Sequence, residues 1–375
     1  MTSEWHEVPL RELVGYISKG IAPSYAEEAS ESTIRVLNQK CNRNFRISYG
    51  DSRLHDTRKK KVPPERYVKP DDILINSTGA GTAGRIAQIE DVPSATTIDG
   101  HMILIRSNGK VTQKFLGYAL KAHQWEVLQL DEGSTGQTEL NRDRLLDEIM
   151  INYPVSLDEQ NAIVGTLESI DRKLIVNEQL NDNLQQQAQA IYSSMFIDNP
   201  DPAWSHGHLS DLITVKYGKD HKKLADGIYP VYGSGGIMRY VERPLYNKES
   251  VLIPRKGTLN NVMYVNQPFW SVDTMFYTEM KLPNVAKFVY HFVKAKDLAS
   301  MNAGSAVPSM TTDILNAMKV VIPSASALEE FESLVAPMYE AMEANDVQSK
   351  ALSQMRDTLL PKLMSGEIDV SDIQL

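Results

Sequence analysis

The chain has 375 residues, of which 42% are hydrophobic and 23% charged, and its formal net charge is −9. These values are typical of a globular protein with two or three domains. The single cysteine, Cys41, excludes a disulfide framework and a cysteine-based zinc site, and favours a reducing cytoplasm. The first ten residues lack the basic and apolar segments of a signal peptide, and no apolar run reaches the length of a membrane span.

The charges are unevenly distributed along the chain. Residues 38–69 hold ten Lys or Arg against three acids, whereas residues 156–200 hold two bases against seven acids. Residues 327–375 hold three bases against ten acids. The net acidity therefore belongs to two segments that also look helical, and the basic excess belongs to a globular segment. A basic run of this kind is more often a solvated surface than a nucleic-acid site, so it does not by itself identify a function.

The two halves of the chain repeat the same order of elements. Trp5 is followed by Leu10 and Leu13, and Trp204 by Leu209 and Leu212 at the same spacing. Further matches are 71–79 with 249–257, 96–104 with 270–278 (which aligns Asp99 with Asp273), 114–121 with 287–294, 133–141 with 303–311, and 149–154 with 318–323. Internal duplication of this kind indicates two copies of one structural unit. Each copy combines a mixed α/β domain with a long helix.

Residues 158–197 and 327–365 are predicted to be the long helices. Apolar residues recur with a 4-3 spacing in both, which is the repeat of a coiled coil. Both seams are interrupted at the same two central positions, by Asn177 and Asn181 in one helix and by Asn345 and Ser349 in the other. Buried amides of this kind fix the register of a coiled coil at a cost in stability.

The direction of the helix pair is not decided by the pattern alone. Antiparallel pairing places Asn177 against Ser349 and Asn181 against Asn345, whereas parallel pairing places Asn177 against Asn345 and Asn181 against Ser349. Two domains related by a pseudo-twofold axis, each followed by its own helix, favour the antiparallel pair. In that pair Ile163 meets Leu363, and Met195 meets Phe331.

We therefore expect an α+β protein with two similar mixed α/β domains. Two long helices separate the domains and form an antiparallel coiled coil, and the whole is pseudo-twofold symmetric. The expected segments are a first domain at 1–156, a central helix at 157–198, a second domain at 199–326 and a C-terminal helix at 327–375. The sequence Asn199-Pro-Asp-Pro202 is expected to stop the central helix.

Three motifs suggest a catalytic or cofactor site, but their context does not support one. Residues 79–84 read GAGTAG, yet the RIAQI that follows is typical of a strand, whereas a dinucleotide site needs a helix there. His206 and His208 lack further ligands at matching spacing. Asp71 and Asp72 precede an apolar strand and are typical of a turn. No Asn/Asp-Pro-Pro-aromatic motif of an amino-methyltransferase is present, and we predict no catalytic residues and no metal site.

Polar and basic loops are the remaining candidates, as a DNA-binding surface. Asn, Gln, Lys and Arg pair with base edges, and lysine clusters suit phosphates. The candidates in the first half are Asn38, Gln39, Lys40, Arg43, Arg58, Lys59, Lys60 and Lys61. Those in the second half are Lys219, Lys222, Lys223, Ser234, Arg255, Lys256 and Asn260. The glycine-rich segment around Ser234 corresponds in position to residues 37–40.

Several stretches resemble type I restriction–modification specificity subunits. They are ALSQMRDTLLPKLMSGEIDV at 351–370, GSTGQTELN at 133–141, YPVSLDEQNAIV at 153–164 and DDILINSTGAGTAGRIAQI at 71–89. The second half departs from this pattern, with GSAVPSMT at 304–311 and LEEF at 328–331. The resemblance implies two target-recognition domains, each reading one part of a split DNA site, in a subunit that is not itself an enzyme.

The resemblance also implies partners. These are two methyltransferase subunits and the translocating endonuclease subunits, on which S-adenosylmethionine, Mg and ATP would be bound, so that this chain carries no cofactor of its own. Two alternatives remain: a stand-alone DNA nuclease or methyltransferase with duplicated domains, and a coiled-coil scaffold that does not bind DNA. The absent catalytic and cofactor motifs argue against the first.

Overall fold

The computed structural model describes residues 4–79, 81–132, 139–301 and 309–370. The chain divides into two compact units. Unit 1 comprises Met1–Val176 and Gln348–Leu375, and unit 2 comprises Asn177–Val347. Two long helices, α4 (Leu157–Ser193) and α8 (Ala325–Met364), contribute to both units. The turns expected at 133–138 and 302–308 lie outside the described residues.

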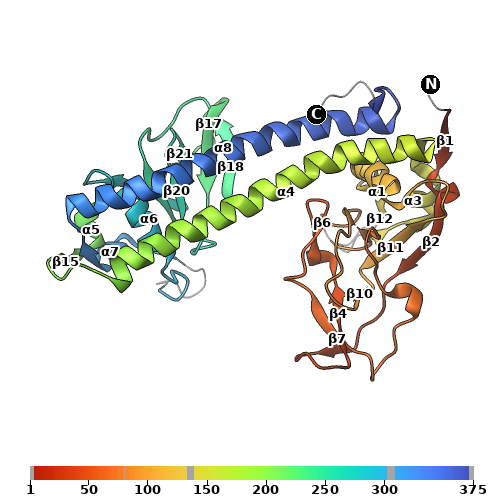
Figure 1. Ribbon diagram of the computed structural model, residues 1–375, viewed down its shortest axis with the longest axis horizontal. Helices are drawn as coiled ribbons and strands as arrows, with labels where there is room; N and C mark the ends of the chain where they lie inside the picture. Colours follow the sequence, from red (N-terminus) through yellow and green to blue (C-terminus); the bar gives the residue numbers. More distant parts are fainter. Residues whose placement is uncertain (1–3, 80, 133–138, 302–308, 371–375) are drawn as a thin grey trace. The chain divides into compact units, whose positions relative to one another are not determined.

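Unit 1 is a mixed α/β unit built on two four-stranded sheets and a strand pair. The first sheet has the order β2-β11-β8-β9 and is antiparallel (Val14–Lys19, Met102–Ser107, Ile73–Asn76, Ile86–Gln88). The second has the order β10-β4-β7-β3 (Thr96–Ile98, Thr33–Leu37, Arg53–Asp56, Tyr25–Ala26). Strands β1 (Trp5–Pro9) and β14 (Met150–Pro154) form the antiparallel pair. Figure 1 shows the first sheet nearer to α4 and the second farther from it.

Shorter elements complete unit 1. The helices are α1 (Gln113–Ala122), α2 (Gln124–Val127) and α3 (Arg142–Glu148), with 3-10 turns η1 (Leu10–Glu12), η2 (Gln39–Cys41) and η3 (Pro64–Arg66). The short strands are β5 (Asn42–Arg43), β6 (Arg46–Ile47), β12 (Asp131–Glu132) and β13 (Glu139–Leu140). Helix α1 carries the apolar residues Phe115, Leu116 and Leu120, which are fully buried between the first sheet and α4.

Unit 2 repeats this order with fewer strands. Its antiparallel sheet is β16-β22-β19-β20 (Ile213–Tyr217, Met275–Met280, Ser250–Pro254, Met263–Val265). The second sheet is β18-β17-β21 (Gly236–Val241, Asp226–Gly233, Trp270–Ser271), and β15 (Ser205–His208) pairs with β23 (Lys319–Ile322). The helices are α5 (Leu209–Leu212), α6 (Ala286–Lys294) and α7 (Thr312–Asn316). The duplication predicted from the sequence is therefore confirmed.

The register of the duplication differs by one residue from the sequence alignment. Asp99 N donates to Leu37 O at 2.9 Å, and Val272 N donates to Tyr232 O at 3.1 Å. The residue equivalent to Asp99 is therefore Val272, and the alignment of Asp99 with Asp273 is wrong. The sequence alignment matched the two aspartates because they are identical residues. Structural equivalence follows from the backbone hydrogen bonds, which shift the register by one residue. A second pair of bonds, Met102 N to Asp99 O at 3.1 Å and Met275 N to Val272 O at 2.9 Å, gives the same correspondence, with Leu37 equivalent to Tyr232 as the sequence predicted.

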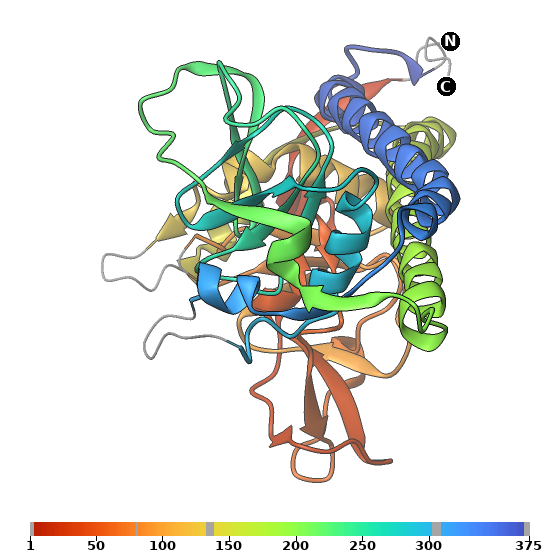
Figure 2. The same ribbon diagram turned by 90° about the vertical axis from the view of Figure 1, so that its left-hand side faces the viewer.

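The helices α4 and α8 run antiparallel. In unit 1 the start of α4 shares a core with the end of α8, through Ile163, Leu167, Leu360 and Leu363. In unit 2 the end of α4 shares a core with the start of α8, and the residues include Ala188, Tyr192, Phe331 and Val335. The two views of the molecule show these segments side by side (Figures 1 and 2). The antiparallel direction expected from the repeat is thus confirmed.

Three of the four polar seam residues, Asn177, Asn181 and Asn345, lie in unit 2, and Ser349 lies in unit 1. Asn345 Nδ2 donates to Asn181 Oδ1 at 2.8 Å, and Asn181 Nδ2 donates to Asp346 Oδ1 at 2.8 Å and to the Met342 carbonyl at 3.3 Å. Asn177 is buried and donates to the Asn345 carbonyl at 3.4 Å. The amide of Asn181 therefore satisfies both its donor and its acceptor groups across the helix pair. A helix slip would leave these amides among apolar side chains.

Each unit also has a polar cluster that ties its domain helix to α4 and α8. In unit 1, Asp171 accepts from Tyr118 at 2.9 Å, Lys121 at 3.0 Å and Arg356 at 3.1 Å. This explains the single arginine in the apolar seam. In unit 2, His291 takes the place of Tyr118 and contacts Gln189 at 2.8 Å and Tyr339 at 3.0 Å. The two units thus use a charged and a neutral cluster at equivalent positions.

No helix among the described residues is both long enough and apolar enough to cross a membrane. The helical backbone that begins with α4 continues to Asp198 in a π-helical turn, Ser194–Asp198, and ends before Asn199-Pro200. The predicted stop is confirmed.

Candidate nucleic-acid interface

A pocket of about 340 Å³ opens on the surface of unit 1. Its lining comes from the second sheet and from loops that leave it: Tyr25, Asn38, Gln39, Lys40, Asp51, Arg53, Asp99 and His101. Three of these residues, Asn38, Gln39 and Lys40, are consecutive candidates from the sequence. They stand at the point where β4 ends, so the buried strand carries them to the surface together.

The turn that holds these three residues is built by Asn38. Its side-chain oxygen accepts from Lys40 N at 2.9 Å, and its Nδ2 donates to the Asp51 carbonyl at 2.8 Å. The amide of Asn38 therefore shapes η2 and joins it to the end of the loop 38–52. Arg43, also a candidate, donates from Nε to the Lys40 carbonyl at 3.3 Å and pairs with Asp51 at 3.8 Å. Asn38 and Arg43 thus organise the loop, while Gln39 and Lys40 remain available to a ligand.

Gln39 lies against the glycine loop that follows β8. Gly79 has φ +119°, and a Cβ at this position would lie 2.9 Å from Gln39 Oε1 and would overlap Thr82 Oγ1. Only glycine allows this close approach. Gln39 Oε1 is buried and has no hydrogen-bond donor among the described residues. An unsatisfied amide oxygen costs free energy, so a ligand donor at this point would be favourable.

Arg53, Tyr25 and His101 belong to the pocket, although sequence reasoning did not select them. The Arg53 guanidinium lies 3.6 Å from the centre of the Tyr25 ring, a cation–π contact that holds the arginine at the rim. The His101 ring is exposed and contacts Thr78 Oγ1 at 2.7 Å. Burial raises the pKa of Asp99, whose side chain accepts from His101 N. Arg53 is one of the ten basic residues at 38–69, but its neighbours along the chain do not distinguish it from the others as a DNA-binding residue.

In unit 1, Gln39 packed on Gly79 forms a corner between the second sheet and the glycine loop, and unit 2 has an equivalent corner. Gly257 is equivalent to Gly79, has φ +85°, and a Cβ there would lie 2.7 Å from Ser234 Oγ. Ser234 is equivalent to Gln39 and sits at the tip of the β17–β18 hairpin. Asn261 Nδ2 donates to the Ser234 carbonyl at 2.8 Å and ties the tip to the loop 257–261. In both units a polar side chain after the second-sheet strand therefore packs on a left-handed glycine.

The other candidates of unit 2 surround this corner. Arg255 lies over the Tyr217 ring at 5.3 Å and donates to the Asp273 carbonyl at 3.1 Å. Lys256 forms a backbone bridge to Ser309, and its side chain is exposed. Asn260 uses its amide internally, on Asp297 and on Ala299 N, each at 3.0 Å. It therefore holds the loop 297–299 rather than presenting a free amide.

The lysines of the loop 219–223 are exposed. Arg239 on β18 donates to the Leu224 carbonyl at 3.0 Å and to Asp226 at 2.7 Å, which fastens this loop to the hairpin. Lys222 and Lys223 form no ion pair within the part of the chain that the structure describes. Lys219 is fixed through its backbone, because its carbonyl accepts from Trp270 Nε1 at 2.9 Å.

The basic run Arg58–Lys61 is not part of the unit 1 pocket. It follows the far end of β7 from Arg53. Arg58 binds Asp56 through two hydrogen bonds, and this contact holds the pKa of Asp56 down at about 2. Lys60 Nζ donates to the Ala22 carbonyl at 3.0 Å. Lys59 and Lys61 are exposed and are free to contact a phosphate.

The structure explains the motifs that suggested a cofactor or a catalytic pair. Residues 79–84 connect the antiparallel strands β8 and β9, so the predicted strand after the glycines is confirmed and no helix receives a phosphate there. His208 caps α5. Within the described residues, no three His, Cys, Asp or Glu side chains are grouped to hold a metal ion.

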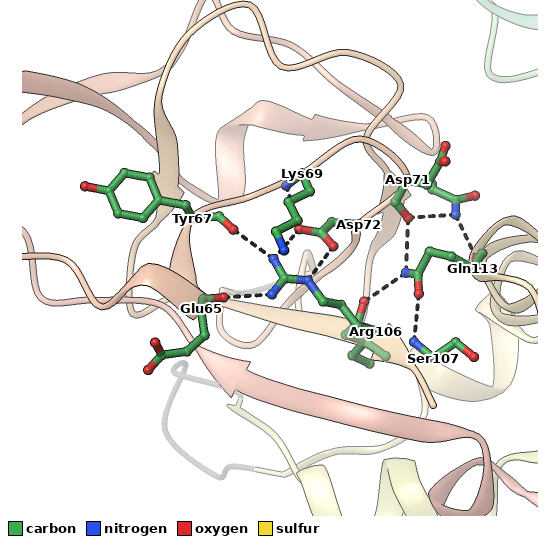
Figure 3. A network of polar contacts seen from close by, with 10 residues as sticks. Glu65, Tyr67, Lys69, Asp71, Asp72, Arg106, Ser107 and Gln113 are labelled. Atoms are coloured by element: carbon green, nitrogen blue, oxygen red, sulfur yellow. Dashed lines mark hydrogen bonds and ion pairs between the residues drawn. The ribbon is translucent and has the colours of Figure 1, made fainter. Parts of the chain in front are cut away.

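The Asp71-Asp72 pair is structural. Asp72 is buried and binds Arg106 through two hydrogen bonds of 2.7 Å, and the guanidinium also donates to the Glu65 and Tyr67 carbonyls (Figure 3). Asp71 has φ +67°, and its carbonyl accepts from Gln113 at 3.1 Å. These contacts fasten the turn before β8 to β11 and α1. Breaking such a buried pair costs about 3–5 kcal/mol, so its role is to hold the sheet that carries the glycine loop.

Comparison with known proteins gives one consistent result. Residues 2–186 and 203–331 each match the family described as type I restriction modification DNA specificity domain. The type I restriction enzyme MjaIX specificity subunit of Methanocaldococcus jannaschii is 24% identical over 323 residues, which cover 74% of this chain and 74% of that protein. A crystal structure of a type I restriction–modification S subunit from Mycoplasma genitalium has a TM-score of 0.61 at 18% identity, covering 97% of this chain and 99% of that one.

The two family matches span most of the chain, one in each repeat. The chain therefore belongs to the type I restriction–modification DNA specificity family. The likeness to the Mycoplasma genitalium structure shows that the fold is shared.

Proposed function

We propose that the chain is the DNA-specificity subunit of a type I restriction–modification complex, and that each unit reads one half of a bipartite site. It is a non-catalytic subunit of such a system. The observation that carries the proposal is the equivalent corner in the two units. Gln39 on Gly79 and Ser234 on Gly257 stand at matching positions. Lys40 and Arg53 line the pocket beside Gln39, and Arg255 and Lys256 directly precede Gly257 in the chain. Base edges are read by such polar groups, while lysines and arginines bind phosphates.

The partners that we propose are double-stranded DNA, two methyltransferase subunits and the restriction/translocase subunits. S-adenosylmethionine, Mg and ATP would be bound by those partners, and the complex would act in the cytoplasm. The acidic helices support this arrangement, since α4 and α8 carry little positive charge for a phosphate backbone. Assembly of the purified chain with methyltransferase subunits alone, followed by addition of the restriction subunits, tests the order and the stoichiometry.

The proposal is tested most directly at Gln39. Replacement by Ala (Gln39→Ala) is expected to relax discrimination at one position of one half-site by about 1–3 kcal/mol, or about 5- to 150-fold, because one amide contact to a base is lost. Lys40→Ala is expected to weaken binding to all sequences alike and to reduce its salt dependence. The measurement is methylation mapping in cells that carry the complete system, with binding of the assembled methyltransferase to duplexes varied at each position.

Lys61→Ala is the matched control, because Lys61 is exposed but lies outside the pocket. It should leave the recognised sequence unchanged. If Gln39→Ala left every position of both half-sites as strictly recognised as before, the pocket would not be the reading site of unit 1. Methyl transfer or DNA cleavage by the isolated chain would instead support a stand-alone enzyme.

We also propose that the asparagine layers set the register of the helix pair, and through it the gap between half-sites. Replacing Asn177 and Asn181 together with Leu (Asn177→Leu, Asn181→Leu) should raise the melting temperature by several degrees, because the buried amide of Asn177 and the partly buried amide of Asn181 give way to apolar packing. The same variant should discriminate less between sites whose gaps differ by one base pair. Thermal unfolding and binding to a series of gap lengths measure the two effects. A variant that is more stable but equally strict about the gap would assign the register to other residues.

A further inference from the structure

The tip of the β17–β18 hairpin carries an exposed apolar pair. Ile237 is 49% exposed and Met238 is 61% exposed, and both directly follow the turn at Ser234-Gly235. Large exposed apolar side chains on neighbouring residues of a loop tip are unfavourable in water unless something covers them. The corresponding place in unit 1 is a polar pocket, so this feature is not a property of the fold.

The hairpin tip is held in place and is not a loose loop. Gly233 pairs with Gly236, and a Cβ at Gly233 would lie 2.5 Å from Met238 Sδ, so the glycine lets Met238 lie across the hairpin. The Ser234 carbonyl is fixed by Asn261, as described above. The apolar pair is therefore presented at a defined position beside the corner that matches the unit 1 pocket.

The surroundings of the pair are cationic. The loop with Lys222 and Lys223 is fastened to β18 by Arg239, and Arg255 and Lys256 precede the glycine on which the tip rests. Of the acids at the base of the hairpin, Asp226 is paired with Arg239, and Glu242 follows β18 at the end away from the tip. An apolar surface bordered by lysines and arginines matches a base edge flanked by phosphates better than it matches an apolar protein surface.

The edge of the second sheet also differs between the units. In unit 1, the outer edge of β7 pairs with β3, and Arg53 on β7 lines the pocket. The residue equivalent to Arg53 is Arg239, because Val36 pairs with Arg53 and the equivalent Val231 pairs with Arg239. Arg239 is occupied internally, and no strand covers β18 among the described residues. In unit 1 the edge arginine therefore lines the pocket, whereas in unit 2 the equivalent arginine is bound internally and the exposed side chains that precede it are Ile237 and Met238.

We propose that Ile237 and Met238 read the C5-methyl group of thymine in the major groove, so that the half-site of unit 2 contains at least one A·T pair specified by this methyl group. The thymine methyl is the apolar feature of the major groove, and apolar side chains recognise it by contact. This inference rests on the proposed DNA-reading role of unit 2 and adds the chemical class of base that it reads.

The test uses the chain assembled with its methyltransferase subunits and a duplex that carries the mapped site. Each thymine of one half-site in turn is replaced by deoxyuridine, which removes only the methyl group. One replacement in the half-site of unit 2 should lower the affinity by about fourfold, the effect of one buried methyl-sized group. Ile237→Ala and Met238→Ala should each weaken binding to the thymine duplex and should abolish or reduce the difference between thymine and deoxyuridine.

The matched control is Ile228→Ala. Ile228 is 78% exposed on the same hairpin but lies at its other end, in the bulge between Asp226 and Tyr229. This variant should keep the full fourfold difference. All three side chains are solvent-exposed, so the variants should fold, which the melting temperature verifies.

Two results would overturn the inference. They are equal affinity for thymine and deoxyuridine in the unaltered protein, and an undiminished difference in both Ile237→Ala and Met238→Ala. Loss of methyltransferase-subunit binding, with DNA discrimination intact, would assign the pair to a protein contact and overturn it as well. Each of these leaves the specificity role standing, whereas failure of the assembled complex to recognise any split site would remove that role itself.

Discussion

Insertion of one heptad into each long helix, after Gln179 in α4 and after Val347 in α8, should lengthen the gap of the recognised DNA site by about 3 bp. Seven residues add about 10.5 Å of helix, and one base pair spans about 3.4 Å. Both insertion points lie between paired layers of the antiparallel seam, so the 4-3 repeat is preserved. Because α4 and α8 are the segments that pass from unit 1 to unit 2, they are the parts of the chain able to act as a ruler.

Affinity for the original site should fall by about 10³-fold or more, towards the level of non-specific binding, because the two half-sites could no longer be engaged together. Methylation mapping and binding to duplexes with gaps changed by one base pair at a time measure both effects. Insertion of a heptad into α4 alone serves as control. It puts the seams of the two helices out of register, so it should destabilise the helix pair without producing a new preferred gap between the half-sites. An unchanged gap in the double insertion would show that the helices do not determine the spacing.

Unit 2 should lose stability when the pH falls from about 6.5 to about 4, and His291 should account for about 3 kcal/mol of that loss. The ring is fully buried, and this burial lowers its pKa from 6.5 to about 4. Between pH 6.5 and pH 4 the imidazole of His291 is protonated in the unfolded chain but stays neutral in the folded chain, so acidification favours unfolding. A shift of about 2.5 units corresponds to about 3 kcal/mol. The loss should level off below about pH 4, where the folded form also binds the proton.

The groups around His291 are neutral. Gln189 and Tyr339 contact its two ring nitrogens, Tyr192 stacks on its face at 5.7 Å, and Tyr290 lies beside it. Burial raises the pKa of Tyr339, so this phenol stays protonated. On the same helix, Lys287 lies one turn before His291 and pairs with Glu332 of α8, and the exposed Lys294 lies three residues after it. Within the described residues no carboxylate contacts the His291 ring, so none there favours its protonated form.

The measurement is urea unfolding between pH 7.5 and 4, followed by the fluorescence of Trp204 and Trp270 in a chain whose other two tryptophans are replaced by Phe. His291→Gln should flatten the pH dependence relative to the parent, even if it lowers stability at every pH. Burial also raises the pKa of Asp346, and this contribution is common to parent and variant. His206→Gln, at an exposed position, should retain the parental slope. If His291→Gln kept the full slope, the loss would have to come from carboxylates.

The local pattern of the sequence was sufficient for the architecture. The duplicated order of strands and helices, the two long helices and the stop after Asp198 follow from apolar periodicity and turn residues, which act over a few positions. The heptad seam left the direction of the helix pair open, because Ile163 finds an apolar partner in either direction, and the duplication of the domains favoured the antiparallel pair. Even the correspondence of Leu37 with Tyr232 could be predicted, since each ends a buried strand before a polar loop.

Individual roles in the candidate site depended on contacts between distant segments. Tyr25, Arg53 and His101 meet Gln39 only because β3, β7 and the turn after β10 converge at one edge of unit 1. Asn38 and Asn260 have the right side chains for base reading, yet their amides are used by neighbouring loops. Arg58 is bound by Asp56, whereas Lys61 a few residues later is exposed.

The sequence by itself determined the class of fold, the order of its elements and the positions of the helices, because these depend on the period with which apolar side chains recur. Tertiary structure alone decided which polar side chains remain available. A hydrogen bond forms with whichever partner folding brings within reach, and Asp72 met Arg106 across 34 positions of the chain while Asn260 met Asp297 across 37. Such partners leave no periodic signal, so the free and the engaged members of one loop look alike in the sequence.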